Sequence, residues 1–173
     1  MVSVGPYNES TNFRHMFDLP DLRGPLPEKK LPENSLSGII RSHPDFSKFR
    51  YLLKLANLED IYANSQTTYT VFVPSDDALE KIMPDDVFLN MDIGTARNIV
   101  KNSTLERRIP SSILSDSPSS IFYTINKPSR IHVTNVKGRI YLNQTINVIH
   151  KDMAASNGII HVIDNLMMRQ DYQ

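Results

Sequence analysis

Carboxylates and imidazoles are the side chains of this sequence that could do chemistry, because the chain contains no cysteine. Adjacent aspartates occur at Asp76-Asp77 and again at Asp85-Asp86, and paired carboxylates can act as general acid and base. Neighbours in a helix point in different directions, however, and both pairs fall where a helix dipole favours anions. The sequence also lacks a nucleophile elbow and a Gly-rich phosphate loop. We therefore expect no catalytic residue and no enzymatic activity.

Three histidines in the C-terminal part are candidate metal ligands: His132, His150 and His161. Their spacing matches no metal-ligand motif. His161 shares a strand face with apolar neighbours, so the alternative is a buried neutral ring with both nitrogens hydrogen-bonded. We expect this structural role for His161, with no metal site and no cofactor.

The overall charge is balanced, with 19 Lys and Arg residues against 19 Asp and Glu residues. Nucleic-acid and membrane-surface partners favour basic patches, so we expect neither kind of partner. No apolar run approaches the roughly 20 residues of a membrane-spanning helix. The first residues lack the basic and apolar regions of a signal peptide. We expect either a chain that is not secreted or a piece excised from a longer protein.

Helical patterns dominate the first half of the sequence. Residues 1–30 are rich in proline without a sustained period and predict an extension or linker, whereas residues 31–173 predict a single domain. Ser35, Asp45 and Ser75 each precede a helical pattern and are expected N-caps. The expected helices cover residues 35–42, 45–56, 58–63, 75–83, 84–91 and 93–101.

Strand patterns dominate the second half, after one early strand at residues 69–73. The later expected strands cover residues 121–125, 130–135, 139–143, 145–150 and 159–163. Lys137-Gly138 predicts a hairpin turn, and Asn157-Gly158 predicts a sharp turn that tolerates positive φ. The nearly unbroken β-branched run at 159–163 predicts a strand buried on both faces, placed between elements laid down earlier. Helices followed by strands indicate an α+β fold.

Two motifs resemble the signatures of fasciclin-type domains, the repeats of fasciclin I, periostin and the stabilins. The run Tyr69–Leu79 (YTVFVPSDDAL) is similar to the first signature, and Asn157–Asp164 (NGIIHVID) is similar to the second. Both motifs occur in the family's order. The resemblance covers roughly residues 31–168 and implies a fasciclin-like β-wedge of short strands packed with several short helices.

The resemblance also implies a function, namely non-enzymatic adhesion to a cell-surface receptor of integrin type or to a matrix component outside the cell. In periostin-like members, a stretch ending in Asp-Ile or Asp-Met is implicated in integrin-mediated adhesion. The corresponding stretch here ends in Lys151, Asp152 and Met153, which are therefore the candidate partner-binding residues. Asp152 is expected on a loop, where its carboxylate could complete the coordination of a divalent ion that the receptor holds. The alternative is an ordinary turn residue that hydrogen-bonds local backbone N–H groups.

Two other features bear on this implied function. The family's usual Tyr-His pair is replaced here by Asn102-Ser103, so the contribution of that pair cannot be transferred. Glycosylation triplets begin at Asn8, Asn102 and Asn143, which is compatible with a secreted glycoprotein. An intracellular or structural scaffold with the same fold remains an alternative, as does a ligand-binding protein.

Overall fold

Helices precede most strands in the folded chain, as expected for an α+β fold. The computed structural model describes residues 20–21, 24–25 and 30–168. The chain divides into two units, Met1–Lys30 and Leu31–Gln173. In the first unit, β1 (Pro20–Asp21) pairs antiparallel with β2 (Gly24–Pro25). The second unit contains the remaining helices and strands.

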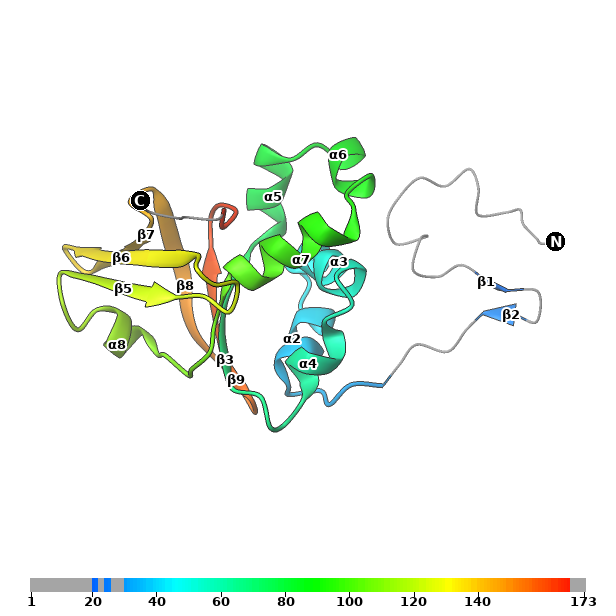
Figure 1. The fold of residues 1–173 in the computed structure, drawn as a ribbon, viewed down its shortest axis with the longest axis horizontal. Helices are drawn as coiled ribbons and strands as arrows, with labels where there is room; N and C mark the ends of the chain where they lie inside the picture. Colours follow the sequence, from blue (N-terminus) through cyan, green and yellow to red (C-terminus); the bar gives the residue numbers. More distant parts are fainter. Residues whose placement is uncertain (1–19, 22–23, 26–29, 169–173) are drawn as a thin grey trace. The chain divides into compact units, whose positions relative to one another are not determined.

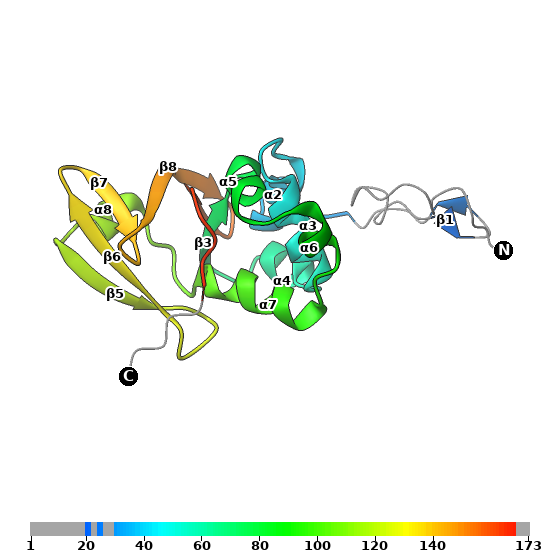
Figure 2. The same cartoon turned by 90° about the horizontal axis from the view of Figure 1, so that it is seen from above.

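The helices of the second unit gather at one end in two perpendicular views (Figures 1 and 2). They are α2 (Leu36–Ser42), α3 (Ser47–Leu55), α4 (Glu59–Ala63), α5 (Asp76–Ile82), α6 (Asp85–Leu89) and α7 (Ile93–Asn102). A further short helix, α8 (Ser111–Leu114), lies among the strands. None of the helices within the described ranges is long and apolar enough to cross a membrane.

The strands form one seven-stranded sheet in the order β4-β3-β9-β8-β7-β6-β5. They are β3 (Tyr69–Pro74), β4 (Thr104–Leu105), β5 (Ser119–Tyr123), β6 (Arg130–Val136), β7 (Arg139–Leu142), β8 (Ile146–Ala155) and β9 (Gly158–Ile163). β9 runs parallel to β3, and the other neighbouring pairs are antiparallel. The two edge strands approach each other at an isolated bridge between Leu105 and Thr124.

The prediction that the last strand lies between earlier elements is confirmed. β9 is inserted between β3 and β8, and all six of its residues are buried. Its last residue, Ile163, belongs to a buried apolar cluster of the core. That cluster comprises Phe72, Leu105, Ile109, Leu114, Ile131, Val133, Ile140, Leu142, Ile146, Ile163 and Met167. The C-terminal part of the chain thus completes the core instead of covering it.

The predicted N-caps are correct at two positions and wrong at the third. The Ser35 hydroxyl accepts a hydrogen bond from Gly38 N, and the Ser75 hydroxyl accepts one from Ala78 N. Asp45 does not cap α3. The carboxylate of Asp76, thirty residues further along, takes that role: it accepts from Ser47 N at 3.2 Å and from Lys48 N at 2.8 Å. The cap is tertiary, so local spacing could not reveal it.

The two predicted turns also differ in outcome. Lys137 and Gly138 have φ of 52° and 81°, so they form the expected hairpin turn between β6 and β7. The β8–β9 turn consists of Ser156 and Asn157, and neither Asn157 nor Gly158 has positive φ. The prediction that this Asn-Gly pair serves to allow positive φ is therefore wrong. Gly158 is needed for space, because a Cβ there would lie 2.0 Å from the backbone oxygen of Tyr69.

Asn157 joins the β8–β9 turn to the helices through its side-chain amide. Its Oδ1 accepts from Leu36 N at 2.8 Å, and its Nδ2 donates to Tyr62 O at 2.9 Å and to Asn64 O at 3.1 Å. The side chain is 4% exposed, so these bonds replace water for every polar atom of the amide. One residue therefore fixes the start of α2 and the end of α4 against the sheet.

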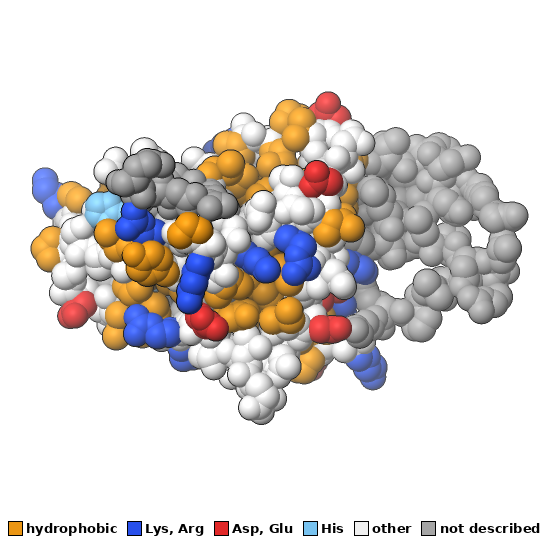
Figure 3. Space-filling model, in the orientation of Figure 1, with side chains coloured by type: hydrophobic (Ala, Val, Ile, Leu, Met, Phe, Trp, Pro, Cys, Tyr) orange, Lys and Arg blue, Asp and Glu red, His pale blue; other side chains and the backbone are white. Residues whose placement is uncertain are grey.

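On the face drawn in Figure 3, Lys and Arg side chains are interspersed with Asp and Glu. This distribution agrees with the formal net charge of zero. No single large field of one sign dominates that face, so local clusters of charge decide which partner groups it favours.

Replacement of Asn157 should destabilise the domain strongly. Asn157→Ala removes three hydrogen bonds and leaves the buried Leu36 N–H, the buried Tyr62 carbonyl and the part-buried Asn64 carbonyl without that partner. We expect the free energy of unfolding to fall by about 2–4 kcal/mol, measured by urea denaturation. Asn90→Ala is the matched control, because Asn90 is exposed and bonds only to the local Asp86 O. Equal stability of the two variants would contradict the assigned role.

Candidate functional site

The candidate partner-binding residues lie on β8 at an irregularity of the strand. The register of β8 against β9 shifts between Val148 and His150 and again between His150 and Met153. Asp152 has φ of 66° within this segment, which is a conformation typical of a β-bulge. The expectation that Asp152 lies on a loop is therefore wrong. A bulge re-aims side chains, and here it separates Asp152 from its neighbour Met153.

The Asp152 carboxylate is turned toward α8. It accepts hydrogen bonds from the backbone N–H of Ser111, at 2.8 Å, and from the Ser111 hydroxyl. These bonds satisfy an N–H in the first turn of α8, where the helix has no internal acceptor. Partial burial alone would raise the pKa of Asp152, but the two Ser111 bonds and the nearby His161 and Lys151 outweigh it and lower that pKa. Asp152 remains exposed and ionised at neutral pH.

His161 supports the bulge from inside the sheet. Its side chain is fully buried, Nδ1 accepts from Asp152 N at 3.1 Å, and Nε2 lies 2.9 Å from Ile109 O. Since a carbonyl only accepts, the proton resides on Nε2 and the ring is neutral. Burial lowers the pKa of His161, against the opposing effects of the Ile109 carbonyl and the Asp152 carboxylate. His161 thus links β9 to the backbone of Asp152.

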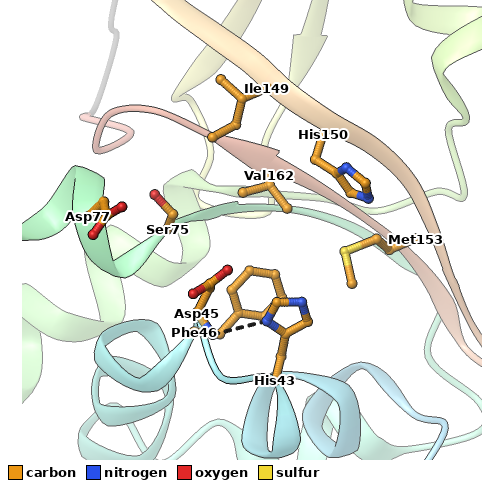
Figure 4. Close-up of a pocket in the computed structure, with 9 residues that line it drawn as sticks. All are labelled: His43, Asp45, Phe46, Ser75, Asp77, Ile149, His150, Met153 and Val162. Atoms are coloured by element: carbon orange, nitrogen blue, oxygen red, sulfur yellow. Dashed lines mark hydrogen bonds between the residues drawn. The ribbon is translucent and has the colours of Figure 1, made fainter.

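An open pocket of about 350 Å³ lies beside the bulge. Figure 4 shows residues of the α2–α3 connection facing residues of β8 across it, with the start of α5 at one side. The lining residues are His43, Asp45, Phe46, Ser75, Asp77, Ile149, His150, Met153 and Val162. Met153 therefore faces this pocket, whereas Asp152 faces α8.

The pocket combines an apolar interior with an acidic rim. Phe46 and Val162 are buried, and Asp45 and Asp77 are exposed. The His43 ring stacks on Phe46 with centroids 4.1 Å apart, and its Nδ1 accepts from Asp45 N at 3.1 Å (Figure 4). Such a surface suits an amphipathic group with an apolar body and a cationic or polar end.

The same pocket offers little support for catalysis. Ser75 contributes a hydroxyl to the lining, and its oxygen accepts from Ala78 N as the cap of α5. A nucleophile needs a base within hydrogen-bond distance, and within residues 30–168 no hydrogen bond joins Ser75 to a histidine. The arrangement favours binding.

The other predicted site residues are dispersed. Lys151 is exposed on β8. Asn157 lies in the β8–β9 turn, Gly158 is the first residue of β9, and His161 is buried within β9. Among the described residues, no group of three or more His, Asp or Glu side chains could hold a metal ion. His132 instead lies 2.6 Å from the Ser119 hydroxyl, far along the sheet from β9.

The three glycosylation triplets are not equivalent in the fold. Asn102 is 4% exposed and its Oδ1 accepts from Asn126 Nδ2 at 2.8 Å. The amide nitrogen of Asn143, to which a glycan would be attached, is also buried. The structure thus buries Asn102 and the attachment atom of Asn143, and glycosylation at either position stays a prediction. Asn8 lies outside the described residues.

Sequence reasoning missed the acidic rim of the pocket. Asp45 was expected as a helix cap and Asp77 as a partner of the helix dipole, so neither was assigned to a site. They belong to segments about thirty residues apart, which are joined by the hydrogen bond from Asp76 N to Asp45 O at 2.8 Å. Only the signature run Tyr69–Leu79 could have drawn attention to Asp77.

Comparison with known proteins places this fold among adhesion-related proteins. The sequence model described as Fasciclin domain matches residues 44–169. Human Stabilin-1 is 25% identical over 129 residues, which cover 75% of this chain and 5% of that protein. Fasciclin-1 of Drosophila melanogaster is 28% identical over 155 residues, covering 81% and 24% respectively. The chain thus spans at most about a quarter of these relatives.

A solved structure agrees with the sequence comparisons. It is a FAS1 domain pair from the insect cell adhesion molecule Fasciclin I, similar with a TM-score of 0.62 and 26% sequence identity. The match covers 80% of this chain and 52% of that chain.

The buried His161 should make the domain less stable in mild acid. Its pKa is lowered in the folded state, so below about 6.5 the unfolded chain binds a proton that the folded chain excludes. The free energy of unfolding should therefore decrease as the pH falls from 7.5 to 5, by at most about 1.4 kcal/mol per pH unit from this group.

Urea denaturation at several pH values measures this dependence. His161→Gln keeps a donor and an acceptor but cannot titrate, so its slope of stability against pH should be smaller than that of the native domain. Identical slopes for the native domain and His161→Gln would refute a neutral, acid-sensitive His161.

Proposed function

The chain belongs to the Fasciclin domain family, and on that premise we propose that it is a non-enzymatic adhesion module that binds a cell-surface receptor or matrix protein outside the cell. Domains of this family are typically cell-adhesion modules, and one relative of known structure is described as an insect cell adhesion molecule. The proposal concerns the module alone, because the chain spans a small part of its relatives.

The observation that carries the proposal is the open pocket beside the β8 bulge. Its wall includes Met153, and the exposed side chains of Lys151 and Asp152 lie next to it on the same strand. An apolar interior with charged groups around it resembles the composition of protein-binding hot spots and their rims. These residues lie on a strand that is paired with β9, so binding would not have to order a loop and would not pay that entropy cost.

Asp152 can contribute to binding although Ser111 already donates to it. A carboxylate has two oxygens with about four acceptor positions, and Ser111 uses one on each oxygen. The free positions are exposed to solvent. We therefore propose that Asp152 offers an oxygen ligand to a divalent ion held by an integrin-type receptor, since such hard cations prefer oxygen.

Cell attachment to the immobilised purified domain tests this role of Asp152. Asp152→Asn keeps the shape of the side chain and tolerates φ of 66°, unlike alanine, but removes the charge. We expect it to lower attachment about tenfold, equivalent to about 1.4 kcal/mol, and expect chelation of divalent ions to abolish attachment to the native domain.

Two further variants separate direct contact from support of the fold. Ser111→Ala removes the hydroxyl bond but leaves the carboxylate, so attachment should be retained. Asp86→Asn removes an exposed carboxylate on α6 and should also leave attachment unchanged. If Ser111→Ala lowers attachment as much as Asp152→Asn, Asp152 acts through α8. Native-level attachment by Asp152→Asn would exclude Asp152 as a contact.

A further inference from the structure

Strand β5 is at an edge of the sheet. Within residues 30–168 it pairs along its length with β6 alone and meets β4 only at the bridge that follows it, and it reads Ser-Ser-Ile-Phe-Tyr without a charged residue or proline. Ile121 and Tyr123 are 53% and 57% exposed. Edge strands are usually blunted by charge, proline or covering segments, because their free backbone groups pair with other chains. This edge lacks those charges and prolines within the strand.

The hydrogen bonds around β5 show which backbone groups point outward. Thr124 N donates to Ser129 O and Asn135 N donates to Pro118 O, so even-numbered residues face β6. Backbone groups alternate sides along a strand, so odd-numbered residues face away from β6. Ile125 confirms this direction, because its N–H donates to Thr104 O of β4 at 3.0 Å. The N–H and C=O groups of Ile121 and the N–H of Tyr123 therefore point away from β6, whereas the Tyr123 carbonyl faces Glu106 at the bridge to β4.

A pocket opens where β4 and β5 part. The two strands meet at the bridge between Leu105 and Thr124 and then diverge. The space between them, about 280 Å³, is lined by Leu105, Glu106, Arg107, Ile109, Ile121, Phe122, Tyr123 and Lys127. Leu105 and Ile109 are almost fully buried and Phe122 packs on the core cluster, so the floor is apolar.

The rim of this pocket favours carboxylates. Arg107, Lys127 and Glu106 are all exposed, so cations outnumber anions. Arg130, the first residue of β6, adds a guanidinium 5.9 Å from the centre of the Tyr123 ring. Figure 3 shows hydrophobic side chains on this part of the surface with Lys and Arg side chains beside them.

We propose that the β5 edge is a docking site for an extended protein segment that carries alternating apolar and acidic residues. The segment adds a strand beside β5 by bonding to the backbone of Ile121 and Tyr123. One apolar side chain enters the pocket between β4 and β5, and flanking carboxylates pair with Arg107 and Lys127. Backbone bonds supply affinity and the pocket supplies specificity, as in other cases of strand addition. β5 itself carries no carboxylate, which favours a partner over a second copy of this chain.

The first experiment uses a synthetic seven-residue peptide with valine at alternate positions and glutamate between them, titrated into the whole chain. Backbone amide NMR signals of Ile121 and Tyr123 should shift, and their hydrogen exchange should slow at least tenfold on saturation. Two control peptides carry lysine in place of glutamate or N-methyl groups on the backbone. Both should bind at least tenfold more weakly, because they lose the charge pairing or the strand pairing.

Two variants locate the site. Ile121→Pro removes an outward N–H without touching the bonds to β6 and should weaken peptide binding at least tenfold. The double variant R107E/K127E changes only the charge of the rim and should reverse the preference between the acidic and basic peptides. It tests the site even if the proline variant does not fold. Lys81→Glu, on the exposed side of α5, is the charge control and should bind normally.

Three results would overturn the proposal. One is the absence of shifts at Ile121 and Tyr123 at millimolar acidic peptide. Another is equal binding of the acidic and basic peptides to the native chain. The third is a concentration-dependent dimer, detected by analytical ultracentrifugation, that shifts these same amides without peptide, since the edge would then be occupied by a second copy.

Discussion

The buried amide of Asn157 is the contact on which the rest of this domain depends. It lies in a two-residue turn between β8 and β9, yet all of its hydrogen bonds lead to helices encoded about one hundred residues earlier. The backbone of the same turn adds bonds from Tyr69 N to Asn157 O and from Ser156 N to Asn34 O. A buried amide must satisfy both its donors and its acceptor, so the helices and the hairpin can meet in only one arrangement.

The functional surfaces follow from the position of that hairpin. Once the turn is fixed, β9 lies between β3 and β8, and His161 reaches the backbone of Asp152 from inside the sheet. The bulge at Asp152 then directs its carboxylate to Ser111 and leaves Met153 on the pocket wall. The same series of hydrogen bonds therefore connects the core at His161 with the candidate site at Asp152. The β5 edge is at the other end of the strand order, and it meets β4 at the bridge between Leu105 and Thr124. Ile109, whose carbonyl accepts from His161, also lines the pocket beside β5.

Local patterns in the sequence predicted most of the fold. The caps at Ser35 and Ser75 and the hairpin at Lys137-Gly138 depend on neighbours within four residues, and the β-branched run at 159–163 identified the central strand. Features that depend on distant contacts were not predictable: the cap of α3 by Asp76, the role of Asn157, and the burial of Asn102 and the Asn143 amide nitrogen. The candidate site was predicted only in part, because the bulge that separates Asp152 from Met153 arises from pairing with β9.

Native-state hydrogen exchange of the Leu36 amide tests most directly whether the hairpin turn locks helices and sheet into one cooperative unit. Leu36 N donates to Asn157 Oδ1 at 2.8 Å, so this amide reports the contact itself. We expect Leu36 to exchange only through global unfolding, with the same free energy of opening as the central β9 residue Ile160. Exchange of Leu36 through a low-energy local opening, while Ile160 stays protected, would contradict this expectation.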